Sequence, residues 1–156
     1  MEIAGLPVHP LVVHAAVTLI PLSALFAIAF VVLPRWRWLS RWPTALLAVA
    51  ALAVAWVARL SGAALLDSRP ELARLVAEHQ TRGQLLSLVA IPYAVIVVLA
   101  AWSMAGGTAL ASGRGGQESR IPALETVLAA LVVIAALAVL VLVVLTGDSG
   151  SRAVWG

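Results

Sequence analysis

Four long apolar stretches take up most of this chain and constrain its fold more than any other feature. They cover residues 11–33, 44–66, 85–104 and 122–146. Each has about the 20 residues that a helix needs to cross the hydrocarbon core of a membrane. A helix is also the form that satisfies every backbone hydrogen bond within the segment, as lipid requires. The sequence therefore predicts an all-α fold, an integral membrane four-helix bundle that makes a single transmembrane domain over residues 1–156.

The composition supports a membrane protein. Hydrophobic residues make up 63% of the chain and charged residues 11%, against about 45–50% and about 25% in a typical soluble domain. A soluble domain of this size could not bury so much apolar surface. The basic residues are all Arg, a bias that favours a bacterial source. The absence of Cys excludes disulfides, iron–sulfur clusters and thiolate zinc sites.

The connections between the stretches predict which way the bundle faces. Arg35, Arg37 and Arg41 occupy the first connection, whereas no basic residue precedes residue 11. Short Arg-rich loops stay in the cytoplasm, so both termini are expected outside a bacterial inner (plasma) membrane. This orientation depends on the first helix, because five Arg on the predicted inner side barely exceed four in the outer segments. Tryptophans, which favour membrane interfaces, fall at one predicted level: Trp36, Trp38, Trp42 and Trp102.

The other two connections differ in composition. Residues 70–82 begin with Pro70 and then carry apolar residues at helical spacing, with His79 on the same stripe. This pattern predicts a short amphipathic helix in the outer loop, either separate or running into the third apolar stretch, with His79 turned toward the bundle or the headgroups. The segment 105–120 is rich in Gly and Ser, which is typical of a flexible linker.

The few polar residues near the apolar stretches are the candidates for a binding site. His9, His14 and His79 all fall on the predicted outer side, and Arg59 lies about two turns from the outer end of the second stretch. Neutral imidazole is a ligand for haem iron, copper and zinc. We predict His14 and His79 as ligands of haem b or of a metal ion, with His9 as an alternate or third ligand. Arg59 is predicted to hold an anionic group such as a haem propionate.

Simpler roles for the same residues remain open at this stage. Arg59 can extend along its stem to lipid headgroups or to Asp67. His14 can make a contact between helices, and His79 can belong to a helix on the membrane surface.

Signatures of enzymes and of nucleic-acid binding are missing from the sequence. It has no Gly-rich phosphate loop, no GxSxG and no HExxH. No basic stripe with interleaved aromatics points to nucleic acid. No apolar stretch holds a pair of carboxylates, which argues against an ion-coupled transporter. We therefore expect no catalytic residues, and a protein that is not an enzyme by itself.

Both ends of the chain resemble a known family. The opening GLPVHPLVVHAAVTLIPLSALF and the closing LTGDSGSRAVWG resemble the terminal motifs of a bacterial membrane family catalogued as domain of unknown function twenty-two thirty-one. ARLSGAALLD resembles its Ser-Gly turn after the second span. The family's polar positions fall on His9, His14, Ser61, Gly62, His79, Thr146, Gly147 and Gly150. Ala16 and Ser151 stand where the family usually has Pro and Gly. The resemblance implies a four-helix inner-membrane protein. Some members of the family resemble fusions with redox domains of Rieske or cytochrome type, and this association favours a role in electron transfer.

Two functions follow as hypotheses. The first is a small redox-associated subunit that binds haem b or a transition metal near the outer face and passes electrons within a membrane redox complex. The second is a cofactor-free structural or assembly subunit of a larger membrane complex, or of a homo-oligomer. Small residues in the fourth stretch, at Ala129, Ala135 and Ala136, would provide its close-packing face.

Overall fold

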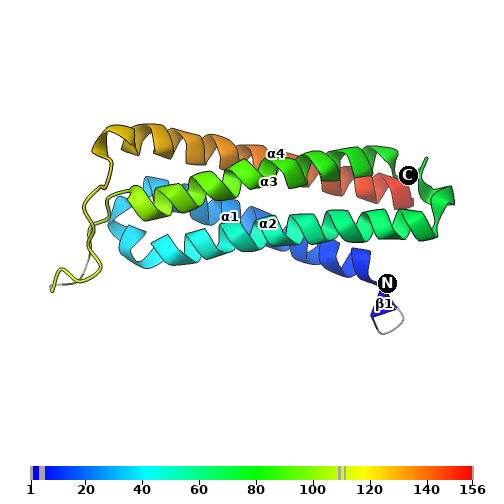
Figure 1. The fold of residues 1–156 in the computed structure, drawn as a ribbon, viewed down its shortest axis with the longest axis horizontal. Helices are drawn as coiled ribbons and strands as arrows, with labels where there is room; N and C mark the ends of the chain where they lie inside the picture. The colour runs from blue at the N-terminus through cyan, green and yellow to red at the C-terminus, as the bar shows by residue number, and fades with distance from the viewer. Residues whose placement is uncertain (1, 4–5, 109, 111, 156) are drawn as a thin grey trace.

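The computed structural model describes residues 2–3, 6–108, 110 and 112–155, and these form a bundle of four long helices (Figure 1). The helices are α1 (Val8–Val32), α2 (Arg37–Ser68), α3 (Ala77–Ser103) and α4 (Glu125–Trp155). Before α1, β1 (Glu2–Ile3) and β2 (Leu6–Pro7) pair in an antiparallel manner. All four helices are long and apolar enough to cross a membrane. The predicted all-α membrane bundle is confirmed.

Prolines mark where the chain turns between helices. Pro34, Pro70 and Pro122 each open a 3₁₀ turn: η1 (Pro34–Trp36), η2 (Pro70–Leu72) and η3 (Pro122–Leu124). Proline suits a first helical turn because that N–H would have no partner within the helix. The helices extend beyond the apolar stretches, since α2 already begins at Arg37 and α4 continues past Thr146. The hydropathy of the sequence therefore identifies the apolar middle of each helix and does not detect the polar turns at its ends.

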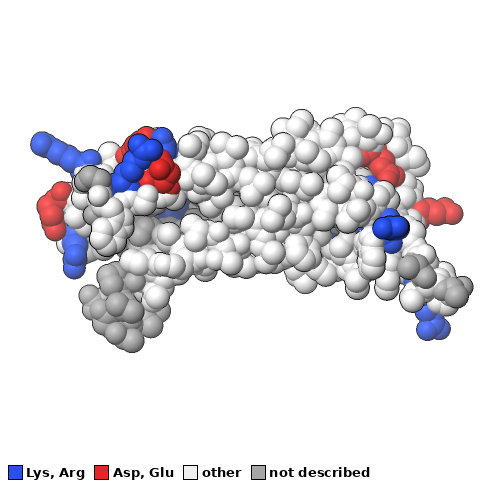
Figure 2. Space-filling model, turned by 180° about the vertical axis from the view of Figure 1, so that it is seen from behind, with Lys and Arg blue, Asp and Glu red and all other residues white. Residues whose placement is uncertain are grey.

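Small residues let the helices approach closely. Ala24, Ala27, Ala48, Ala100 and Ala136 have no exposed surface. Short side chains at such positions increase van der Waals contact between helices, which drives packing in lipid. The outer faces instead carry large apolar side chains, and the charges gather at the two ends, leaving the middle uncharged in the view of Figure 2.

The two ends of the bundle are different structures and are named here by their side chains. The histidine end contains the starts of α1 and α3 and the ends of α2 and α4. The arginine end contains the ends of α1 and α3, the starts of α2 and α4, and the connection 105–120. Both termini lie toward the histidine end (Figure 1).

Two connections differ from the expectations. Residues 70–82 are not one separate surface helix: η2 is followed by turns, and α3 then begins at Ala77 and runs without interruption into the span. Of the predicted apolar stripe, only His79 lies in α3. Leu72 and Val76 precede the helix and line a cavity, whereas Leu75 is 59% exposed. The connection 105–120 is more ordered than a flexible linker, because Gly106 and Gln117 exchange two backbone hydrogen bonds of 2.9 and 2.8 Å.

Candidate functional site: a histidine pair at one end of the bundle

His9 lies at the start of α1 and packs against α2. Its Nδ1 is 3.1 Å from the carbonyl oxygen of Ala58 and 3.0 Å from the Ser61 hydroxyl oxygen. A carbonyl accepts only, so in the neutral ring Nδ1 carries the proton and Nε2 keeps its lone pair. Gly62 provides the space, because a methyl group there would come within 3.0 Å of His9 Cε1.

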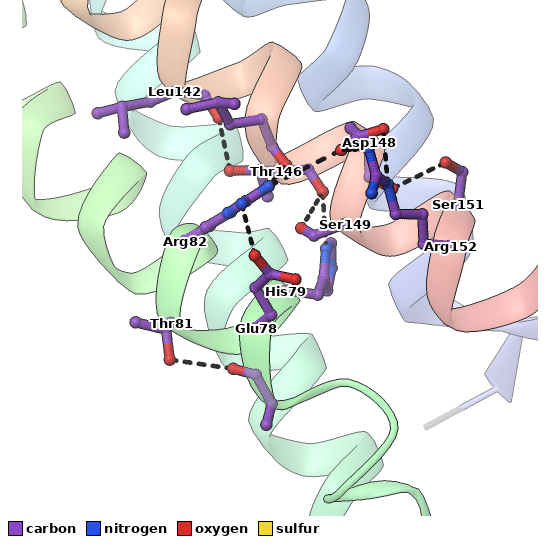
Figure 3. A network of polar contacts seen from close by, with 12 residues as sticks. Glu78, His79, Thr81, Arg82, Leu142, Thr146, Asp148, Ser149, Ser151 and Arg152 are labelled. Atoms are coloured by element: carbon purple, nitrogen blue, oxygen red, sulfur yellow. Dashed lines mark hydrogen bonds and ion pairs between the residues drawn. The ribbon is translucent and has the colours of Figure 1, made fainter. Parts of the chain in front are cut away.

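His79 occupies the equivalent position on the other pair of helices. It lies in the first turns of α3, and its Nδ1 donates to the Thr146 carbonyl oxygen at 2.9 Å (Figure 3). Gly150 of α4 leaves room for the ring, because a methyl group there would come within 3.0 Å of His79 Nδ1. In the neutral ring of His79, the proton is therefore also on Nδ1, and Nε2 keeps its lone pair.

The two arrangements share the same parts in the same order. The second helix of each pair carries a Ser-Gly dipeptide, Ser61-Gly62 in α2 and Ser149-Gly150 in α4. Each Ser hydroxyl donates to the carbonyl three residues earlier, at 3.0 and 2.9 Å. That same carbonyl accepts the His Nδ1–H. We call each set of His, carbonyl, Ser and Gly a histidine cradle.

The two cradles face one another. The ring centres of His9 and His79 are 6.1 Å apart, and their planes meet at 74°. Both rings line a cavity of about 390 Å³, a volume within the usual range of small-molecule sites. Arg59, Gln80 and Gln84 add polar groups to a wall that is otherwise mostly apolar.

The predicted site residues are only partly brought together. His9, His79 and Arg59 line the same cavity, and the guanidinium of Arg59 also stacks 5.0 Å from the Trp56 ring centre and donates to Ser87 at 3.3 Å. His14 is exposed and does not line the cavity; its Nδ1 lies 2.6 Å from the Pro10 carbonyl oxygen of its own helix. The ring that faces His79 is thus that of His9, in the first turn of α1, whereas His14 lies on the exposed face of the same helix.

Ion pairs surround the cradle of α3 and α4. Arg82 pairs with Glu78 and donates to the Leu145 carbonyl at 2.8 Å, and Arg152 lies 3.1 Å from Asp148 (Figure 3). These groups are partly or largely exposed. They lie outside the set of residues that lines the cavity.

Ser149 and the cradle function of the two glycines escaped the sequence analysis. The signal was present as a recurrence: Ser-Gly stands at the same end of α2 and of α4. A dipeptide is too short to be recognised as a repeat until its position against a histidine is known.

Taken together, the fold and the site define a four-helix integral membrane protein with a pair of cradled imidazoles at one end. The family model described as "Predicted membrane protein (DUF2231)" matches residues 5–156. The chain belongs to this family, as the resemblance of its terminal motifs implied. No curated protein and no solved structure matches the chain.

Proposed function

We propose that the protein is a redox-associated membrane subunit that binds haem b between His9 and His79. The observation that carries this proposal is the pair of cradles, which present two neutral imidazoles to one cavity at a ring separation of 6.1 Å. Hydrogen bonding of Nδ1 to a carbonyl fixes the orientation of a metal-ligating imidazole and increases its basicity. Imidazole is a common protein ligand of haem iron, and both rings are available to one ligand because they line the same cavity.

The donor set favours haem over a bare metal ion. Among the described residues there is no group of three or more His, Asp or Glu side chains that could hold a metal. Zinc sites normally take three or four protein ligands, so two imidazoles alone would bind it weakly. Haem brings four nitrogens of its own and needs only axial ligands from the protein.

The remaining cavity residues support an amphipathic ligand. Apolar side chains such as Val13, Val17 and Leu86 would contact a macrocycle, and Arg59 would pair with an acidic substituent. When bound, the haem would supply reversible one-electron chemistry. The chain itself would hold the iron through the two Nε2 atoms and exclude water from its apolar faces.

The competing hypothesis, a cofactor-free assembly subunit, gains no support from the small residues of α4. Ala136 is fully buried within the bundle, and Ala129 and Ala135 pack against the same core. The small-residue face of α4 therefore serves contacts among the four helices of this chain.

We also propose that the histidine end faces the outside of a bacterial inner membrane. The support is the Arg-rich first connection at the opposite end. Reporter fusions at the two termini test it, since an enzyme active only in the cytoplasm should be silent at both.

The test of haem binding is a reduced-minus-oxidised visible spectrum of protein purified in detergent from its native membrane, with metal analysis of the same sample. We expect a haem b signal that is lost in His9→Ala and in His79→Ala. His14→Ala is the matched control, because this exposed histidine is on the same helix as His9 and should leave the spectrum unchanged. A folded wild-type protein with neither haem nor metal would overturn the proposal, and metal without haem would replace haem with an ion.

A further inference from the structure

The arginine end contains a row of polar groups without partners. The indole N–H of Trp38, Nε of Arg41 and the hydroxyl of Thr44 are buried and make no hydrogen bond within the part of the chain that the structure describes. The three residues follow one another at intervals of three along α2, and therefore lie on successive turns near one face. Buried donors without acceptors are rare, because each loses about 1–3 kcal/mol of solvation.

Arg41 also lacks a counter-charge. Its side chain makes one hydrogen bond, from Nη2 to the Met104 carbonyl at 3.2 Å, and it forms no ion pair among the described residues. The nearby guanidinium groups of Arg37 and Arg120 act on it with the same sign of charge. Glu125 is already paired with Arg37 at 2.7 Å, and Glu118, the other carboxylate of the arginine end, forms no ion pair among the described residues.

Arg37, at the same end of α2, differs from Arg41 because every nitrogen of its guanidinium has a hydrogen-bond acceptor. Its guanidinium donates to the carbonyls of Phe30, Val31 and Ala105 as well as to Glu125, at 2.7–3.0 Å. Four such bonds fix Arg37 in place, whereas one bond leaves Arg41 able to turn outward along its flexible stem.

The surroundings of Arg41 match the headgroup region of a membrane. Trp36, Trp42 and Trp102 are exposed at this end, as expected for indoles at an interface. Arg120 is itself exposed and stacks 4.7 Å from the ring centre of Trp102. The five Arg and two Glu of the arginine end account for the whole net charge of +3.

We infer that the arginine end binds the phosphate group of an anionic phospholipid, with Arg41 and Arg120 as its cationic ligands. A phosphodiester offers only acceptors, which is what unpartnered donors and uncompensated arginines require. Trp38 would add an indole N–H. Anionic lipid attracts each Arg near the membrane surface by about 1 kcal/mol, so recognition depends on charge as well as on donors.

The test compares lipids of equal chain length in mixed micelles with the delipidated full-length protein. Phosphatidylglycerol is expected to raise Tm by several degrees more than phosphatidylcholine does. Arg41→Gln should weaken the apparent affinity for phosphatidylglycerol about five-fold, the effect of one Arg beside an anionic surface. Arg114→Gln is the matched control, because this exposed residue at the same end would lose only general attraction to the anionic surface, and its affinity should fall less than that of Arg41→Gln, which also loses hydrogen bonds to the phosphate.

Further measurements distinguish a lipid headgroup from a free phosphate compound and guard against a variant that does not fold. If Arg41→Gln fails to fold, Arg120→Gln provides the same comparison from an exposed position. Equal stabilisation by the two lipids, or an equal loss in Arg114→Gln, would overturn the inference. Full stabilisation by soluble glycerol 3-phosphate at the same concentration would also overturn it, in favour of a site for free phosphate.

Discussion

The two ends of this bundle place polar groups in lipid by opposite means. At the arginine end a permanent charge, Arg37, is enclosed by three carbonyls and one carboxylate. At the histidine end the inner groups are neutral imidazoles, each bound on one side only, beside a cavity of about 390 Å³. Arg37 is therefore held by partners on all three of its guanidinium nitrogens, whereas the proposed function uses the second ring nitrogen of each imidazole.

Removing the enclosed charge should give the largest effect on stability. Arg37→Met leaves the partly exposed Glu125 and three carbonyls without their donor, and the loss of hydrogen bonds to a charged group costs about 1.5–3 kcal/mol. The free energy of unfolding in detergent measures it. Arg35→Met, at an exposed neighbouring position, is the control and should change stability by less than about 0.5 kcal/mol. Similar values for the two variants would remove the contrast between the ends.

Filling a cradle should affect the histidine end next most strongly. Gly150→Ala places a methyl group 3.0 Å from His79 Nδ1, so the ring must move, at a cost of about 1–3 kcal/mol. The proposed haem signal should weaken with it. Gly147→Ala is the matched control for stability on the same helix: nothing lies within 4 Å of the new methyl, and a helical Gly→Ala change should stabilise by about 0.4–1 kcal/mol. Because Gly147 also lines the cavity, the two variants are compared by stability and not by the haem signal. A stable Gly150→Ala protein with an unchanged signal would show that the cradle does not position His79.

A polar contact between the two ends should have a moderate effect. The Tyr93 hydroxyl is buried 2.6 Å from the Ser23 hydroxyl in the middle of the bundle. Tyr93→Phe should destabilise by about 0.5–1.5 kcal/mol, the usual net value of one hydrogen bond. A double-mutant cycle with Ser23→Ala isolates the pair, and additivity of the two changes would mean that the contact contributes nothing.

The rim of the histidine end should show the smallest effect. Arg152 and Asp148 are an exposed pair one turn apart on α4, with Arg152 74% exposed. Arg152→Gln is expected to change stability by no more than about 1 kcal/mol, and added salt should reduce the difference because it screens exposed charges. A loss as large as that of Arg37→Met would contradict the distinction between rim charges and the enclosed arginine.

The sequence was sufficient for the bundle and only partly sufficient for the site. Four apolar stretches leave a chain of 156 residues few other folds in lipid, so the helices were predictable. Clustering of the three histidines was predictable at the level of one bundle end. Their pairing was not, because His9 and His14 are five residues apart, and only the true start of α1, at Val8, decides which of them faces inward.

The arginine end was harder still to predict. Arg37 and Arg41 read as loop charges because they precede the second apolar stretch, yet both are buried in the first turns of α2. Their burial depends on carbonyls contributed by α1 and by the chain after α3. Such partners are distant in the sequence and become visible only after the helices are packed.

The repeated cradle has a consequence for the origin of the chain. α1 with α2, and α3 with α4, each form a hairpin that carries one imidazole and the glycine beneath it. Each hairpin holds half of the facing pair, and both run in the same direction through the bundle. Two copies of a single ancestral hairpin would assemble side by side into this arrangement. The present protein has the form of two such hairpins joined head to tail, each contributing one ring to the same pair.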